Sequence, residues 1–213
     1  MTEKPKRRKT RGGRISILLA LVAVLAPTAA SAVTLTGTGT GGADALLGTD
    51  DRDTITGLGG DDVIFGLGDR DDIDGGSGDD TINGEGTCPP GAPNISYCSN
   101  DEGTGGSGTA GSDWIRGGSG DDSIAGGGGG DQLYGGTGDD LISGGSGADR
   151  VIGNSGDDEL SGGSGRDYIS GDSGNDRIRA RDGRRDTITC GDGRDWVSAD
   201  PVDNVAADCE RGH

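Results

Sequence analysis

From residue 39 onward, large aliphatic residues recur one at a time, each placed two positions after an aspartate and surrounded by polar residues and glycine. Gly117 to Ala125 reads Gly-Gly-Ser-Gly-Asp-Asp-Ser-Ile-Ala, and Gly75 to Asn83 follows the same pattern. The shared nine-residue row is G-G-x-G-x-D-x-U-x, where U is a large aliphatic residue. Such self-similarity at a fixed period is the sequence signature of a repeat architecture. Rows begin at 39, 48, 57, 66 and 75, eight more run from 108 to 179, and two looser rows follow.

The x-U-x part of each row predicts a very short strand, with U pointing to one side and its neighbours to the other. The six residues before it are rich enough in glycine to turn the chain back. Two rows then form one coil of 18 residues with a strand on each side. Stacking coils at about 4.8 Å builds two parallel sheets that enclose the aliphatic column. The predicted fold class is therefore all-β, a parallel β-roll (β-solenoid).

The aspartate in the sixth position of each row is the main candidate for chemistry. Stacking places the aspartates of alternate rows, such as Asp122 and Asp140, over a shared gap lined by turn carbonyls. Two carboxylates and several carbonyl oxygens form a hard oxygen cage of about six ligands, which suits Ca²⁺ better than Zn²⁺ or Mg²⁺. The candidate metal ligands are Asp44, Asp53, Asp62, Asp71, Asp80, Asp113, Asp122, Asp131, Asp140, Asp149, Asp158, Asp167 and Asp176.

These rows resemble the RTX, or haemolysin-type, calcium-binding nonapeptide repeats, which form parallel β-rolls in secreted bacterial toxins, proteases and lipases. The resemblance covers residues 39–83 and 108–198. It implies that each turn donates its sixth-position aspartate and main-chain carbonyls to calcium. Aspartate pairs 18 residues apart give roughly nine sites, each with the oxygen ligands that calcium prefers.

Some rows depart from the family pattern. Asp51 and Asp69 stand at the fourth position, where the family has glycine. An extra residue between Asp176 and Asp186 breaks the 18-residue spacing, so Asp186 and Asp195 are not counted among the ligands. Glycine is replaced at the second position by Leu58, Leu67, Asn154 and Asp172.

Composition and charge exclude several classes of protein. Glycine supplies 48 of 213 residues, and only 29% are hydrophobic. This composition excludes a helical bundle, and the acidic excess excludes a nucleic-acid binder. The alternative to a repeat protein is a disordered acidic chain, because little apolar surface is available for burial. A folded chain therefore needs a binding partner that neutralises its excess negative charge.

The two ends and one internal segment differ from the repeats. A basic start, the apolar run Ile15 to Ala26 and Ala30-Ser31-Ala32 predict a secretory signal peptide over residues 1–32, the alternative being an uncleaved membrane anchor. Its removal leaves 12 arginines and 36 acids, a net charge of −24. The expected organisation is a first repeat tract at 33–83, an inserted loop at 84–107 that divides two rolls, a second tract at 108–198 and a C-terminal cap at 199–213.

Four cysteines in a secreted chain allow three disulfide pairings. We favour the local one, Cys88–Cys98 and Cys190–Cys209. The first bond would close the inserted loop. The second would fold the C-terminal segment over the open end of the roll, where a solenoid needs a cap. No C-x-x-C is present, and the single histidine is His213, so a zinc site is not expected.

Catalytic motifs are lacking in the sequence. Neither H-E-x-x-H nor G-x-S-x-G occurs, and all lysines lie in the predicted signal peptide. Trp114, Tyr134, Tyr168 and Trp196 take outward strand positions; a sugar-binding stripe is possible, but isolated surface aromatics are the favoured interpretation. The sequence therefore predicts an extracellular, non-catalytic, calcium-binding protein with a structural or adhesive role and an unknown surface protein or polysaccharide partner. The alternative is a calcium-dependent accessory module of a secreted enzyme or toxin.

Overall fold

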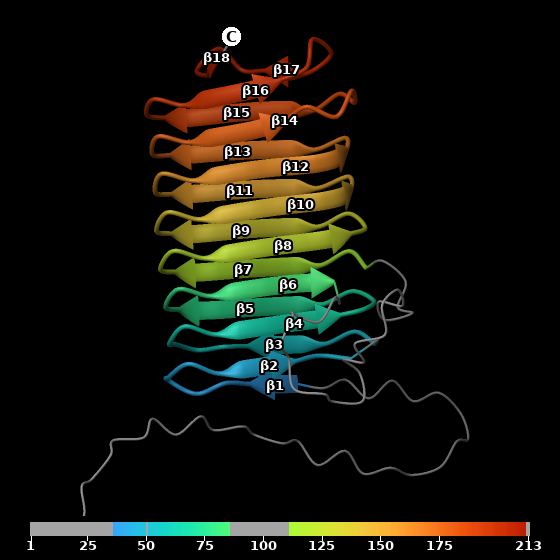
Figure 1. Cartoon of the computed structure of the whole chain (residues 1–213), viewed down its shortest axis with the longest axis vertical. Helices are drawn as coiled ribbons and strands as arrows, with labels where there is room; N and C mark the ends of the chain where they lie inside the picture. The colour runs from blue at the N-terminus through green and yellow to red at the C-terminus, as the bar shows by residue number, and fades with distance from the viewer. Residues whose placement is uncertain (1–35, 50, 86–110, 212–213) are drawn as a thin grey trace, which may run out of the picture.

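The computed structural model describes residues 36–49, 51–85 and 111–211, and this part of the chain is all-β with no helix. The chain winds as a solenoid in which successive strands alternate between two parallel sheets (Figure 1). One sheet has the order β1-β3-β5-β7-β9-β11-β13-β15-β17, and the other holds the even-numbered strands. We call them the odd sheet and the even sheet.

The odd sheet consists of β1 (Thr36–Thr38), β3 (Thr54–Thr56), β5 (Asp72–Ser77), β7 (Trp114–Ser119), β9 (Gln132–Thr137), β11 (Arg150–Ser155), β13 (Tyr168–Ser173), β15 (Thr187–Asp192) and β17 (Asn204–Val205). The even sheet consists of β2 (Ala45–Leu47), β4 (Val63–Leu67), β6 (Thr81–Glu85), β8 (Ser123–Gly128), β10 (Leu141–Gly147), β12 (Glu159–Gly165), β14 (Arg177–Ala180), β16 (Trp196–Ala199) and β18 (Glu210–Arg211).

The two repeat tracts form one continuous roll. Strand β5 pairs with β7, which places Ile73 beside Ile115, and β6 pairs with β8, which places Ile82 beside Ile124. The expectation that the insertion divides two rolls is therefore wrong. The parallel ladders therefore continue from the strands before residue 86 to the strands after residue 110.

Most strands in the middle of the roll are longer than the three residues that the pattern predicts. Strand β7, for example, extends through Gly117 and Gly118 to Ser119. Its glycines keep the parallel register with the next coil, since Gly118 pairs with Gly136. Short turn segments therefore share the backbone hydrogen bonding of the sheets instead of forming separate loops.

Five residues that replace glycine in the turns keep its left-handed backbone conformation. Leu58, Leu67, Asn154 and Asp172 have φ between 70° and 90°, and Asp69 has φ of 62°. This left-handed region is uncommon for residues with a side chain, although Asn and Asp tolerate it best. The turns therefore keep the same backbone shape at these positions. Stacking of the neighbouring coils holds these residues in that conformation.

The core is a column of single aliphatic side chains enclosed between the two sheets. Each strand from β3 to β16 contributes one of them, and nearly all are fully buried: Ile55, Ile64, Ile73, Ile82, Ile115, Ile124, Leu133, Ile142, Val151, Leu160, Ile169, Ile178, Ile188 and Val197. Leu46 and Val205 continue the column at its ends, where they are partly buried. Since the column is thin, each member supports a large share of its own coil.

We expect Ile142→Ala to lower the free energy of unfolding in calcium by about 2–5 kcal/mol, because it opens a cavity in the middle of the column. The neighbouring side chain of Leu141 points outward from the same strand and is 51% exposed. Leu141→Ala is the matched control and should change stability by less than about 0.5 kcal/mol. Chemical denaturation of both variants measures the difference, and equal losses would contradict a core confined to the U positions.

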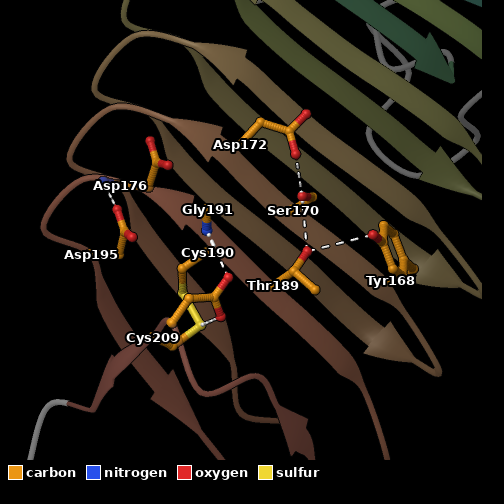
Figure 2. The surroundings of a disulfide bond; sticks show 10 residues. Tyr168, Ser170, Asp172, Asp176, Thr189, Cys190, Gly191, Asp195 and Cys209 are labelled. Carbon is orange, nitrogen blue, oxygen red and sulfur yellow. Dashed lines mark hydrogen bonds between the residues drawn. A yellow bond between two sulfur atoms is a disulfide. The ribbon is translucent and has the colours of Figure 1, made fainter.

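A disulfide between Cys190 and Cys209 closes the C-terminal end of the roll, as predicted (Figure 2). Cys190 is buried in β15, and Cys209 directly precedes β18. The bond connects the last full coil to the segment that carries β17 and β18. The predicted Cys88–Cys98 bond lies outside the described residues. In the described part of the chain, no helix is long and apolar enough to cross a membrane.

The double variant Cys190→Ala, Cys209→Ala should lose about 3 kcal/mol, the effect expected for a disulfide that closes a loop of this length. Because the bond lies at one end of a stack in which each coil contacts its neighbours, we expect the last coils to open first. Hydrogen exchange measures this directly. Amides of β15 to β17 should lose protection while those of β9 and β10 keep theirs; uniform loss along the roll would argue against a local cap.

Candidate metal centres

The sixth-position aspartates lie immediately before the strands, at the two long edges of the roll where the chain turns between sheets. From Asp53 to Asp195 these side chains are at most 3% exposed, although each is a carboxylate. Burying a carboxylate costs several kcal/mol unless a partner compensates it. Two columns of buried acids, one at each edge, therefore require a source of positive charge or of protons.

One oxygen of each carboxylate is held by the backbone of the preceding coil. The N–H of Asp122 donates to Oδ1 of Asp140 at 2.8 Å, and the N–H of Asp140 donates to Oδ1 of Asp158 at 2.8 Å. The same bond recurs along both edges, between 2.8 and 3.0 Å. These ladders fix the direction of every carboxylate and bring successive aspartates into one line.

The insertion does not interrupt these ladders. The N–H of Asp71 donates to Oδ1 of Asp113, and the N–H of Asp80 donates to Oδ1 of Asp122, both at 2.8 Å and across 42 residues of sequence. Counting pairs only at a spacing of 18 residues therefore misses two stacked pairs. The signal that could have found them is the unchanged D-x-U pattern on both sides of the insertion.

The second oxygen, Oδ2, is buried and has no hydrogen-bond donor in the following aspartates: Asp62, Asp71, Asp80, Asp122, Asp140, Asp149, Asp158, Asp167, Asp176, Asp186 and Asp195. A buried polar atom without a partner is rare in native proteins and usually marks a missing ion, water or proton. The structure thus repeats the same unsatisfied carboxylate oxygen along each edge of the roll.

Carbonyl oxygens converge on the same place. A Cβ added to Gly135 would lie 2.1 Å from Oδ2 of Asp140 and 2.8 Å from the carbonyl oxygen of Gly153 in the next coil. Only glycine fits there, because any side chain would occupy the space into which the two oxygens point. The arrangement recurs at Gly57, Gly75, Gly117 and Gly153. Oxygens with lone pairs face each other with no donor between them, which is a suitable environment for a hard cation.

Burial raises the pKa of Asp71, Asp122 and Asp158, and neighbouring aspartates raise it further. Desolvation is the largest cause; it is opposed by the backbone hydrogen bond to Oδ1 and assisted by the charge of stacked carboxylates. The pKa of Asp71 is raised to about 8, and the pKa values of Asp122 and Asp158 to about 7. Without a cation, these three carboxyls in the folded roll therefore keep their protons up to about neutral pH.

Carboxylates alone do not complete a metal site. Among the described residues, no group of three or more His, Cys, Asp or Glu side chains is placed to hold a metal ion. Any ligand set must therefore combine aspartate oxygens with main-chain carbonyls. Calcium accepts such all-oxygen sets and tolerates irregular geometry, whereas zinc requires nitrogen or sulfur ligands in a tetrahedral arrangement. The donors present fit calcium.

The first coil differs from the others. The Thr40 N–H and Oγ1 donate to Oδ2 of Asp44 at 2.5 and 2.8 Å, and Thr49 makes the same two bonds to Oδ2 of Asp53. These two predicted ligands therefore already have donors for the oxygen that is unsatisfied farther along the roll. The threonines stand at the second position of their rows, where glycine is the commonest residue.

The C-terminal end extends the ladders beyond the predicted ligand set. Asp186 and Asp195 are buried and stacked on Asp167 and Asp176 despite the extra residue before them. Asp203, which was not among the predicted ligands, accepts a hydrogen bond from the Asp186 N–H at 3.0 Å. Its signal was present as Asp203-Asn204-Val205, a further D-x-U triplet one residue short of the 18-residue spacing.

Comparison with known families agrees with this geometry. The family model of the RTX calcium-binding nonapeptide repeat (4 copies) matches residues 38–73, 66–86, 107–142, 143–178 and 152–185, which together cover more than half of the chain. The chain belongs to this family. No curated protein matches the sequence. RTX repeats bind Ca²⁺, so the buried aspartate columns lie in calcium-binding repeats, and the predicted parallel β-roll is confirmed.

Proposed function

We propose that this RTX protein is secreted and folds on binding extracellular calcium, and that the folded roll has a structural or adhesive role without catalysis. The column of buried carboxylates with unsatisfied Oδ2 atoms carries the proposal. The folded chain cannot keep these groups charged without cations, and the unfolded chain keeps them in water. Folding and calcium binding are then one coupled reaction.

The proposed ligands are the sixth-position aspartates from Asp44 to Asp176 together with turn carbonyls. Pairs spaced by 18 residues give roughly nine sites, and the stacked pairs Asp71–Asp113 and Asp80–Asp122 add to them. Calcium supplies the positive charge between successive turns. The backbone ladder to Oδ1 keeps each carboxylate aimed at that gap, and the first-position glycines keep the gap open.

Secretion is supported by the basic start and apolar run of residues 1–32, which have the composition of a signal peptide. Extracellular calcium modules bind at about 10⁻⁴–10⁻³ M, far above the free concentration inside cells. The acidic chain would then stay extended before export because its charges repel one another, and it would form the roll outside.

Circular dichroism during a calcium titration tests the proposal, with magnesium as the control ion. We expect a cooperative transition from disordered chain to strand with calcium, because each coil needs its neighbour. Magnesium should not produce it, since Mg²⁺ sheds its waters reluctantly. A chain that remains disordered at about 10 mM calcium, or one that is fully folded in chelator at pH 8, would contradict calcium-coupled folding.

Asp139 and Asp140 offer a matched pair of variants, because Asp139 is exposed and Asp140 is buried. Asp140→Asn should remove the two calcium sites that Asp140 shares with Asp122 and Asp158, since an amide is a weaker calcium ligand than a carboxylate. Its new N–H can also donate to the Gly153 carbonyl, so the calcium-free roll should become more stable. Asp139→Asn should weaken calcium binding by about fivefold at most, the effect of an exposed charge. Isothermal titration calorimetry measures stoichiometry and affinity, and equal effects of the two variants would rule out the buried column as the ligand set.

A further inference from the structure

The outer surface of the odd sheet carries a cluster of aromatic and arginine side chains that calcium binding does not use. Trp114 and Arg116 lie on β7, Tyr134 on β9, Arg150 on β11 and Tyr168 on β13. These four strands are consecutive neighbours in the sheet. We call the five residues the aromatic–arginine face. Of the four aromatic residues expected to be isolated on the surface, Trp114, Tyr134 and Tyr168 lie together on the odd sheet, and Trp196 lies on the even sheet.

The side chains of this face are packed against one another. The guanidinium of Arg116 lies 4.7 Å from the centre of the Trp114 ring, and that of Arg150 lies 4.6 Å from the centre of the Tyr168 ring. The Trp114 and Tyr134 rings are 6.5 Å apart between centroids. Ile152, although it points outward, is only 5% exposed beneath its neighbours. Cation–π contacts of this kind hold arginine at a fixed place without neutralising it.

Hydroxyl groups fix Tyr168 from the other side (Figure 2). Its OH lies 3.5 Å from Oγ1 of Thr189, Thr189 donates to Oγ of Ser170 at 2.9 Å, and Ser170 donates to Oδ1 of Asp172 at 2.5 Å. A ring held by packing and hydrogen bonds loses little entropy when a ligand contacts it. The aromatic–arginine face is therefore ordered before any ligand arrives.

A shallow groove of about 450 Å³ crosses this face, lined by Arg116, Tyr134, Thr137, Asn154 and Ser155 together with glycines. Asn154 stands at the second position of its row, where glycine is the commonest residue, and has a φ of 74°. Residues held by their surroundings in sparsely populated backbone regions cluster at active and ligand sites. Here the replacement adds an amide to a groove that otherwise offers an aromatic ring, hydroxyls and a guanidinium.

The charge of the face is opposite to that of the chain. The outward positions of β7, β9, β11 and β13 hold two arginines and one acid, Asp172, whose Oδ1 accepts the Ser170 hydroxyl, in a chain with 37 acidic residues. In the described residues neither Arg116 nor Arg150 forms a salt bridge, whereas Arg177 and Arg179 on the even sheet pair with Glu159. Two fixed guanidinium groups beside aromatic rings form a site for carboxylates attached to a flat, partly apolar ligand.

We propose that the aromatic–arginine face binds a glycan chain that carries carboxylates, such as an oligosaccharide of uronic acids. Tyr134 and Tyr168 offer ring faces for the C–H faces of sugars, Arg116 and Arg150 receive the carboxylates, and Asn154 and Thr137 meet the hydroxyls. The arginines lie on strands two positions apart in the sheet, and Arg150 is in register with Trp114, two residues from Arg116. Their backbones are therefore about 11–12 Å apart. One glycan chain lying across the strands can therefore contact both. The site requires only that the roll is folded.

Calorimetry of the full protein, folded in calcium as checked by circular dichroism, tests the proposal with short tetramers that do not gel. The probes are tetragalacturonate, a tetramer containing glucuronate, and tetragalacturonate with its carboxylates methyl-esterified. We expect the uronate tetramers to bind and the esterified form to bind about 10-fold or more weakly, the usual cost of losing charge-assisted hydrogen bonds. Absence of binding by both uronate tetramers, or equal binding of the ester, would overturn the proposal.

Variants locate the site. The double variant Arg116→Gln, Arg150→Gln and the single variant Tyr134→Ala should each weaken binding by about 10-fold. Asn154→Gly introduces the commonest residue at this position of the rows, so the variant should fold at least as well yet bind more weakly. Arg177→Gln and Trp196→Ala on the even sheet are the matched controls and should bind as the wild type does. Equal weakening by the control variants, or equally tight binding of a single-stranded oligonucleotide, would show non-specific polyanion binding and refute the assigned face.

Discussion

Gly147→Ala should prevent the central coils from stacking and lower the free energy of unfolding in calcium by more than about 4 kcal/mol. Gly147 has φ of 143°, and a Cβ added to it would lie 1.3 Å from the carbonyl oxygen of Gly129 in the coil before. That carbonyl belongs to the backbone of a tightly stacked turn, so it cannot move aside as the end of a flexible side chain could. Both the φ of the new alanine and the spacing between coils would have to change.

Gly42→Ala is the matched control, because Gly42 is exposed and nothing lies within 4 Å of the position that its Cβ would take. We expect its stability to change by less than about 1 kcal/mol. Denaturant unfolding in saturating calcium gives both values. If Gly147→Ala unfolded at the same denaturant concentration as Gly42→Ala, the coils would have to be packed less closely than the structure shows.

The nine-residue period alone predicts the core and the two columns of buried aspartates. The D-x-U rule places one aliphatic residue in the core and one carboxylate at an edge per row, and the structure has this arrangement from Asp53 and Ile55 to Asp195 and Val197. Such agreement is expected where each nine-residue unit contacts only its neighbours, because the local pattern then fixes the global fold. Little tertiary information is needed beyond the register.

Features that depend on a change of register were not predictable in the same way. The stacking of Asp113 on Asp71 spans 42 residues, and Asp203 lies one residue off the repeat spacing. In both places the spacing between stacked aspartates changes, yet the strands on either side stay in register. A slip by one residue would turn the core residues outward. Burial of the aliphatic column, rather than constant spacing, sets the register there.

The aromatic–arginine face was missed for a different reason. Trp114, Tyr134 and Tyr168 occur in rows that begin at 108, 126 and 162, which are separated by multiples of 18 residues. Rows of the same parity lie on the same sheet, so the sequence contained this placement. It did not contain the contacts of Arg116 and Arg150 with the rings, which depend on side-chain conformations across neighbouring strands.

Proton and calcium binding should compete at the buried aspartates, so the pH dependence of the fold should reverse when calcium is present. The pKa in the folded chain is raised to about 8 for Asp71 and to about 7 for Asp122 and Asp158, from a usual value of 3.8. Between pH 3.8 and these raised pKa values, the calcium-free folded state binds more protons than the unfolded state. The stability that these three groups contribute to the calcium-free fold is therefore complete below about pH 4 and is lost as the pH rises through 7 and 8.

Circular dichroism in chelator should thus show strand structure at acid pH that disappears toward pH 8. In calcium the strand signal should persist at pH 8, and the midpoint calcium concentration should fall as the pH rises, because each ion displaces protons. The double variant Asp122→Asn, Asp158→Asn removes two titrating groups but keeps hydrogen-bond acceptors at their positions, so the transition in chelator should become shallower. A calcium-free strand signal that increases from pH 5 to pH 8 would mean that the aspartates are stabilised as carboxylates without a cation, and the calcium-coupled account would fail.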